Sequence, residues 1–377
     1  SIGLLFISCE KSEREYTEEI LKIDAQINQT IKLSTVCSDL NYLLLDGDER
    51  DFISQVNLLK YNSDDLMVFD QQQKKIFHFT ITGKKINAFK IKEGRGPNEL
   101  LWISDIDVDW KRREIAVLGF AKIVFYDFKG NPVKELQLEN TPIKLAVFDG
   151  NLLLLYRNSK RIDKPSLEPG YKILLIDRDG NILNRFVEKR NAGSEFDFLT
   201  FENFPIYQDE QLVLIPPEYN IYKFKSLDEL AIKYRIDFGD EALPDDFFSE
   251  YITPESAYSA ARDREYASII SIFHETDNLI YFQFFMEKNQ KTKQVFYSKK
   301  SGNYLIGRNI QNDMDDFINS PRFLFGMNNF LIQPLLYHDL KNSVNNSSHL
   351  INKIDKGQPD EFDTVLMLCN AQLNTQQ

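Results

Sequence analysis

The chain has 377 residues, 42% of them hydrophobic and 27% charged, and this balance excludes a wholly disordered protein. The net charge of −12 gives a surface that repels phosphate backbones, so we expect no nucleic-acid partner. The 29 phenylalanines and 17 tyrosines favour β-strands, because aromatic side chains suit pleated, half-buried surfaces.

Residues 1–9 form an apolar run that ends in Ser8-Cys9. The run is too short to span a bilayer, which needs about 20 residues, and we interpret it as the end of a secretory signal whose start is missing. A small residue before cysteine at the end of such a run resembles the bacterial lipobox, although Phe6 and Ile7 stand where leucine and a small residue are usual. The resemblance implies that Cys9 is acylated and becomes the mature N-terminus. A buried apolar strand is the alternative.

Residues 10–30 begin with a charged stretch and are expected to be a solvated tether. Acidic residues directly after the cysteine resemble the surface-export signals of Bacteroides-type lipoproteins. That resemblance implies an outer-membrane lipoprotein that contacts the membrane through its lipid alone, and it leaves open whether the protein faces the periplasm or the exterior. No later segment approaches 18 consecutive apolar residues.

Four segments then share one pattern, an apolar strand followed by a turn with glycine. The strands are residues 76–80, 124–127, 174–177 and 295–297, and the turn glycines are Gly83, Gly130, Gly180 and Gly302. A fifth copy without glycine fits at residues 221–224. The first three glycines recur at intervals of roughly 50 residues, and glycine supplies the positive φ that a tight hairpin needs.

Each unit holds two further strands before its hairpin, at residues 103–108 and 115–118 in the second unit and at 143–148 and 152–156 in the third. Four short strands per roughly 40–50 residues make the blade of a β-propeller. An irregular β-sandwich is the alternative, but regular spacing is hard to obtain from it. With a sixth unit at residues 323–325, 330–332 and 364–368, the sequence predicts an all-β, six-bladed propeller over residues 31–370 and a tail at 371–377.

The sixth unit lacks one strand, and residues 41–45 are an unassigned apolar run. Antiparallel pairing of this run with residues 364–368 would close the ring and remove exposed sheet edges. It would also bring Cys37 towards Cys369, where an exported protein can hold a disulfide. The offset of these cysteines from the strands could leave their Cα atoms beyond the roughly 7 Å that a bridge tolerates, so the bridge stays an open question.

A family resemblance rests on the segment Gly94-Arg95-Gly96-Pro97-Asn98-Glu99-Leu100, which is followed by aspartates at 105–109. This segment resembles the Gly-x-Gly-Pro-Gly-Glu-Phe turn between blades of NHL-type propellers, with Asn98 and Leu100 in place of the usual glycine and phenylalanine. Together with the lipobox-like start, the chain resembles six-bladed propeller lipoproteins of Bacteroides-type bacteria over roughly residues 30–370. That family implies fold and location more than function.

Loop lengths predict a functional face. Turns between the first and second strand of each unit are tight, whereas long connections occur at residues 157–170, 239–266, 286–293 and 334–362. Because strands alternate in direction, all long connections should emerge on one face, here called the insertion face. Function usually lies on such loops, so we predict the deepest pocket beside residues 157–170 and 239–266.

The insertion at 239–266 has apolar residues at helical spacing and Pro254 among acidic residues, which predicts a helix. This helix is either a lid over the mouth or packing on the rim. Candidate ligand contacts on this face are a basic loop, three tyrosines suited to stacking and one arginine. They are Arg157, Lys160, Arg161 and Lys164; Tyr251, Tyr258 and Tyr266; and Arg95. The alternatives are a solvated hairpin tip, rim packing and a turn between blades, respectively.

The four histidines do not recur at equivalent blade positions, so we expect no histidine-built metal site. We also find no nucleophile motif and expect no cofactor. The leading hypothesis is a monomeric, non-catalytic propeller anchored to the cell envelope that binds a glycan, peptide or envelope protein. The alternatives are a polysaccharide lyase or hydrolase acting through carboxylates at the mouth, and a component recruited by a transporter. Clustered inward-facing carboxylates would favour the enzyme, and an apolar, aromatic mouth the binding protein.

Overall fold

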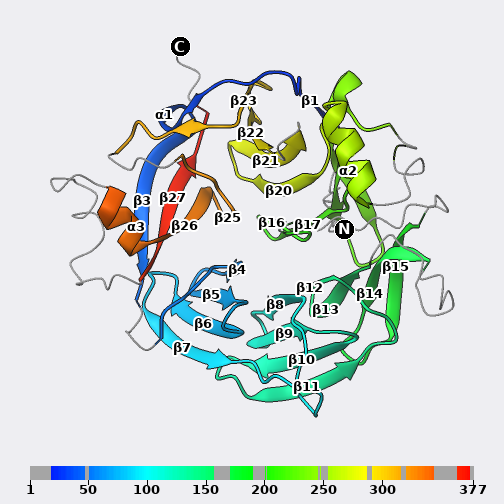
Figure 1. Cartoon of the computed structure of the whole chain (residues 1–377). Coiled ribbons are helices and arrows are strands. Elements are labelled where there is room, and N and C mark those ends of the chain that lie inside the picture. Colours follow the sequence, from blue (N-terminus) through cyan, green and yellow to red (C-terminus); the bar gives the residue numbers. More distant parts are fainter. Residues whose placement is uncertain are drawn as a thin grey trace, which may run out of the picture.

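The structure is a computed structural model. It describes residues 18–46, 51–156, 170–189, 200, 202–244, 247, 254–286, 291–315, 320–343 and 363–373. Sheets of four or five strands are arranged as blades around a common axis (Figure 1). The prediction of an all-β, six-bladed propeller is therefore confirmed.

We number the blades in chain order and give the strands of each from the axis outwards. Blade 1 comprises β4 (Leu58–Tyr61), β5 (Asp65–Asp70), β6 (Lys75–Thr80) and β7 (Lys85–Lys90). Blade 2 comprises β8 (Asp105–Asp109), β9 (Glu114–Leu118), β10 (Lys122–Asp127) and β11 (Pro132–Gln137). Blade 3 comprises β12 (Lys144–Phe148), β13 (Asn151–Leu155), β14 (Tyr171–Ile176) and β15 (Ile182–Glu188).

The second half of the ring follows the same plan. Blade 4 comprises β16 (Ile206–Tyr207), β17 (Glu210–Leu214), β18 (Asn220–Phe224) and β19 (Leu230–Asp237). Blade 5 comprises β20 (Ile270–Glu275), β21 (Leu279–Met286), β22 (Lys291–Ser298) and β23 (Tyr304–Gly307). Blade 6 comprises β25 (Phe325–Met327), β26 (Phe330–Leu336), β27 (Thr364–Ala371) and, from the N-terminal part of the chain, β3 (Cys37–Leu45).

The repeated strands of the sequence pattern are the third strands β6, β10, β14, β18 and β22 of blades 1–5. The four turn glycines that follow them have the positive φ that their hairpins require, between +71° and +89°. The turn glycines in the sequence therefore predicted the positions of these outer hairpins correctly.

The ring closes as predicted. Strand β3 pairs antiparallel with β27, with Leu45 opposite Thr364 and Asn41 opposite Leu368. The last blade is thus built from both ends of the chain, and its sheet edge is covered by a strand that arrives from the other terminus.

Residues 18–36 form a strap along the outside of blades 4–6, and here the structure corrects the expected tether at 10–30. Strand β1 (Glu19–Lys22) pairs parallel with β19, and β2 (Ile31–Lys32) pairs parallel with β24 (Ile310–Gln311) before α1 (Leu33–Val36) leads into β3. Leu21, Ile23 and Ala25 are buried at alternate positions. The charges between them masked this period-two pattern in the sequence, and residues 18–30 belong to the folded unit. Residues 10–17 lie outside the described part.

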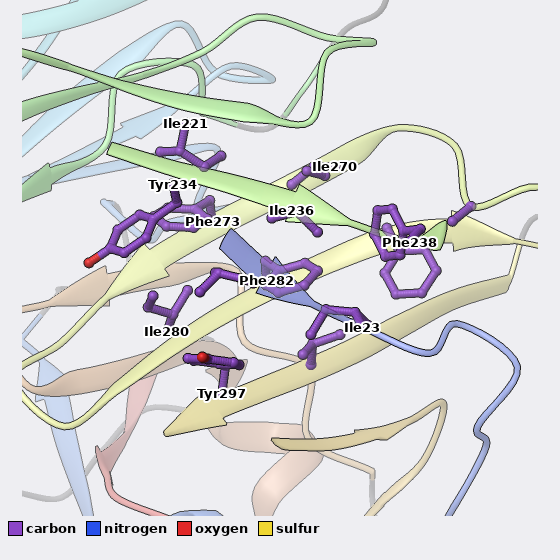
Figure 2. Close-up of a cluster of buried hydrophobic side chains, with 14 of the residues drawn as sticks. Ile23, Ile221, Tyr234, Ile236, Phe238, Ile270, Phe273, Ile280, Phe282 and Tyr297 are labelled. Carbon is purple, nitrogen blue, oxygen red and sulfur yellow. The ribbon is translucent and has the colours of Figure 1, made fainter. Parts of the chain in front are cut away.

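The blades are held together by apolar side chains that alternate along each strand and meet those of the next blade. Figure 2 shows such a cluster, in which Tyr234 and Ile236 of blade 4 face Phe273 and Phe282 of blade 5, with Ile23 of the strap beside them. Successive clusters of this kind form a continuous ring of core and hold the inner strands in place around the axis.

The two faces differ in the way the sequence predicted. Tight turns join the first and second strands of the blades on one face, and the links 91–104 and 238–269 between blades emerge on the other. One expected insertion, at residues 286–293, is wrong, because β21 and β22 stay paired to Met286 opposite Lys291 and only residues 287–290, outside the described part, lie between them. In the expected insertion at 334–362, β26 runs on to Leu336 and α3 (Tyr337–Ser343) follows. Residues 344–362 lie outside the described part.

The predicted helix in the 239–266 insertion is α2 (Pro254–Asp263), preceded by the short helix η2 (Gly239–Glu241). Ala257 and Ala261 are buried in a small cluster with Phe247 and Ile269. The helix lies at the periphery, beside blades 4 and 5, and does not cover the centre of the ring (Figure 1). Of the two interpretations, packing on the rim is the one that the described residues support.

Candidate functional site: the axis and the insertion-face mouth

The structure places two of the predicted contact residues plainly. Tyr266 packs edge-on against Phe247 at 5.7 Å between ring centroids, so this ring serves the rim cluster. Arg95 is exposed on the link between blades 1 and 2. Tyr258 falls within α2. The other predicted positions lie outside the described residues, namely Cys9, Arg157, Lys160, Arg161, Lys164 and Tyr251, and so does most of the loop expected beside the pocket.

The segment around Arg95 is a turn between blades, as its family resemblance implied. Glu99 accepts a hydrogen bond from the Gly96 amide at 2.9 Å. Gly94 has φ +150°, and a Cβ there would lie 2.0 Å from a carboxylate oxygen of Glu99. Gly94 therefore holds this turn in a backbone conformation that other residues rarely adopt, and Leu100 at its end is buried.

The aspartates that follow this turn join two blades. The carboxylate of Asp105 accepts a hydrogen bond from the Leu145 amide at 3.0 Å, and that of Asp107 accepts one from the Val147 amide at 2.7 Å. Both amides belong to β12, the innermost strand of blade 3, whose axial edge has no partner strand. The alternating carboxylates of β8 thus satisfy backbone groups that a propeller would otherwise leave unpaired.

Lys60 connects these carboxylates to the far side of the ring. Its Nζ lies 3.4 Å from Asp107 of blade 2 and 2.9 Å from Glu202, which lies just ahead of Asn203 in the segment that leads into the first strand of blade 4. Blade 4 stands opposite blade 1 in a ring of six, so the Lys60–Glu202 pair crosses the axis. Lys144 lies 3.7 Å from Asp105. We call Lys60, Asp107 and Glu202 the axial triad.

Burial sets the electrostatics of this cluster. The side chain of Lys60 is only 14% exposed and that of Asp107 only 6%. Burial would lower the pKa of Lys60, but the nearby carboxylates of Asp107 and Glu202 outweigh it and raise the pKa above its ordinary value. Burial also raises the pKa of Asp107, against the opposing effect of Lys60. The lysine is therefore a permanent cation between two carboxylates.

The two histidines inside the blades have structural partners. His78 bonds to Asp65 at 2.7 Å within blade 1. His274 on β20 contacts the carbonyl oxygen of Leu324 at 3.3 Å, and burial lowers its pKa. Within the part of the chain that the structure describes, no group of three histidine, cysteine or acidic side chains could hold a metal ion.

The insertion face carries an apolar surface that the sequence analysis missed. Leu101, Trp102 and Phe120 are 58%, 62% and 69% exposed. The loops that carry them run side by side: Gly119 lies so near the carbonyl oxygen of Trp102 that a Cβ on this glycine would be 2.9 Å from it. Leu101 and Trp102 lie in the link between blades 1 and 2, just before the innermost strand β8 of blade 2, and Phe120 lies in the turn between β9 and β10. We call these three residues the aromatic patch. A sequence signal existed, since Leu101 and Trp102 directly follow the turn motif.

Comparison with known proteins identifies the family. A family model described as a domain of unknown function, DUF4934, matches residues 18–369. The chain belongs to this family. Among curated proteins none matches. The match begins where the strap begins, in agreement with the role of residues 18–36 in the folded unit.

Two solved structures share the fold. A candidate exported protein of Bacteroides fragilis NCTC 9343 superposes with a TM-score of 0.72 at 18% identity, over 94% of this chain and 100% of its own. A DUF4221 member from Bacteroides vulgatus ATCC 8482 gives 0.52 at 11% identity, over 90% and 98%. At these identities the likeness shows the fold alone. Within the described residues, no helix is long and apolar enough to cross a membrane.

Proposed function

We propose that this protein is a non-catalytic binding module of the bacterial cell envelope that holds a polypeptide partner on its insertion face. The aromatic patch is the observation that carries the proposal. Soluble monomers seldom expose contiguous apolar surface without a role in binding, and tryptophan is among the residues that contribute most to protein interfaces. Here the patch lies on loops of the face that carries the insertions.

The composition of the patch favours a polypeptide over a sugar. A tryptophan, a phenylalanine and a leucine from adjacent loops offer an apolar surface, which suits an apolar side chain of a partner. Sugar recognition would need directional polar groups around the rings. Lys122 of the same blade already binds Glu135 and the carbonyl oxygen of Gly96, each at 3.2 Å.

The state of the axial carboxylates supports binding over catalysis. Asp107 accepts a backbone hydrogen bond and faces Lys60, Asp105 accepts another and faces Lys144, and Glu202 pairs with Lys60. Carboxylates do cluster at the axis, as a lyase or hydrolase would require. However, each is bound to groups that hold the blades together, so a general acid or base would have to break a structural contact.

The envelope location is part of the proposal. It is supported by the lipobox-like Ser8-Cys9 and by the B. fragilis neighbour that is a candidate exported protein. Cys9→Ala in the precursor should release the protein from the membrane fraction. Unchanged membrane association would contradict the lipid anchor and leave the binding surface to be judged separately.

The binding surface is tested with a double variant, Trp102→Ala with Phe120→Ala. Val133→Ala is the matched control, because Val133 is a 49% exposed apolar residue of the same blade on its outer strand. Immobilised protein is incubated with envelope extract, and bound proteins are quantified by mass spectrometry. We expect the wild type and the control to retain similar amounts of their partner proteins. The amount retained by the double variant should be at least about tenfold lower.

The same three proteins are applied to a glycan array. If a glycan is retained by the wild type and the control but not by the double variant, the ligand of the aromatic patch is a sugar and not a polypeptide. Equal retention of all partners by the wild type and the double variant, with unchanged thermal unfolding, would overturn the proposed site.

A further inference from the structure

Three cysteines occur in the chain, and two of them meet at the closure of the ring. Cys37 begins β3 and Cys369 lies near the end of β27, so the two come from opposite ends of the sequence. Both are buried, and both belong to the same core cluster. The third, Cys9, lies in the segment that resembles a lipobox. The folded unit thus has two thiols, and they lie on the two strands that must stay paired.

A β-bulge puts both thiols on one face of the sheet. Cys369 faces Leu40 and Ala371 faces Cys37, with Ser38 as the extra residue of β3 between these pairs. Regular alternation would put Ser38 on the face of Leu40 and Cys37 on the opposite face. The extra residue reverses this order, so that Cys37 shares the buried face with Cys369.

Cys37 stands opposite Ala371, two residues after Cys369 on β27, so the two thiols are diagonal neighbours on this face. Burial raises the pKa of the Cys369 thiol, and the neighbouring Cys37 thiol raises it further. Cys37 also donates to the carbonyl oxygen of Asp39 at 3.1 Å. The bulge therefore brings both cysteines onto one face, diagonally across the paired strands, and reduces the offset that the sequence left between them.

We propose that Cys37 and Cys369 form a disulfide that locks the closing strand β3 onto β27. The proposal rests on the export of the protein, because disulfides persist in oxidising compartments. The Sγ–Sγ bond forms as the two S–H bonds break. The two protons pass to solvent, and the two electrons reduce the disulfide of a thiol–disulfide oxidoreductase or of oxidised glutathione to two thiols. Since both sulfurs are buried once the ring has closed, oxidation accompanies the docking of β3.

The chemistry is tested on the full chain in a Cys9→Ala background, which removes the third thiol. The unfolded, reduced protein is refolded with oxidised and reduced glutathione, then unfolded without reductant and treated with a maleimide. We expect no alkylation of the wild-type pair, two additions after reduction, and a cross-linked peptide containing both cysteines. Two alkylated thiols after oxidative refolding would overturn the proposal, whatever the cellular location of the protein.

The melting temperature distinguishes a disulfide that fits the native fold from one that strains it. The oxidised protein should melt about 5 °C above the reduced protein, because the bridge closes nearly the whole chain. The variants Cys37→Ser and Cys369→Ser should melt alike under both conditions. An oxidised form that melts below the reduced form would also refute the bridge. Alkylation of the protein in the cell envelope fraction then tests export. If Cys37 and Cys369 are free in the cell but form the bridge during refolding, the proposed location is wrong and the proposed disulfide stands.

Discussion

Replacing Lys60 by methionine should show how much the axial triad contributes to stability. Methionine keeps the length of the side chain and removes the charge, so Asp107 and Glu202 lose their shared cation. Breaking a buried ion pair by removing one partner costs about 3–5 kcal/mol, because a charge is left uncompensated. Since the side chain of Glu202 is 22% exposed, water relieves part of this cost, and we expect about 3 kcal/mol at neutral pH.

This loss converts into a modest change in melting temperature. Unfolding entropy near 60 °C is about 2.1 cal/mol/K per residue, so a chain of this length has roughly 0.8 kcal/mol/K and should melt about 4 °C lower. The matched control is Lys111→Met, since Lys111 pairs with Asp149 at 3.7 Å but is 86% exposed. Exposed pairs contribute at most about 1 kcal/mol. Guanidinium unfolding followed by tryptophan fluorescence measures both variants.

Two further measurements separate the ion pair from lost packing. Adding Glu202→Gln to Lys60→Met should restore part of the stability, because one uncompensated carboxylate is gone. Lowering the pH should also reduce the penalty, since burial already raises the pKa of Asp107 and its protonation removes the second charge. If Lys60→Met costs no more than Lys111→Met at neutral pH, the axial triad does not hold the ring together.

Two further predictions concern the closure and the inner strands. Gly83→Ala should cost clearly more than Gly302→Ala. Both positions have positive φ, which costs a residue with a Cβ about 1–2 kcal/mol. A Cβ on Gly83 would also lie 2.1 Å from the carbonyl oxygen of Leu44, whereas one on Gly302 would meet its nearest atom at 3.5 Å. Equal melting temperatures of the two variants would contradict this steric account. For His274, burial lowers the pKa, so the unfolded state binds more protons and stability falls as the pH drops below about 6.5, by at most about 1.4 kcal/mol per pH unit. The melting temperature of His274→Gln should therefore fall less between pH 7.5 and 5.5, and parallel profiles would refute this assignment.

The sequence predicted the features that depend on local chemistry. Turn glycines indicated the outer hairpins. The pairing of residues 41–45 with the C-terminal strand could be predicted because the sixth unit lacked one strand and this run was unassigned. The strap was missed for a local reason too. Leu21, Ile23 and Ala25 alternate correctly, but the charged residues between them resemble a solvated segment. In the structure those charges lie on the outer face, while the alternate positions pack against the blades.

The candidate site was harder to predict because it depends on neighbours far apart in sequence. Nothing local to Lys60 shows that Glu202 will lie across the axis, since this requires the ring to be closed first. Likewise, Trp102 and Phe120 would have been taken for core residues by their type. Their exposure follows from the position of two loops at the edge of blade 2, which only the packing of the adjacent blades decides.

The aromatic patch stands on a rigid base, and this determines how it can bind. The amide of Ser104 donates to Leu118 at 2.7 Å and that of Gly119 donates to Lys122 at 2.8 Å, so both loops are fixed at the point where they leave blade 2. The aspartates of β8 bind the same blade to blade 3, and Lys60 connects it to blades 1 and 4. A partner that docks on the patch therefore meets a preorganised surface and orders little of the chain it contacts. Binding to such a surface loses less conformational entropy, so three exposed side chains can carry much of the affinity.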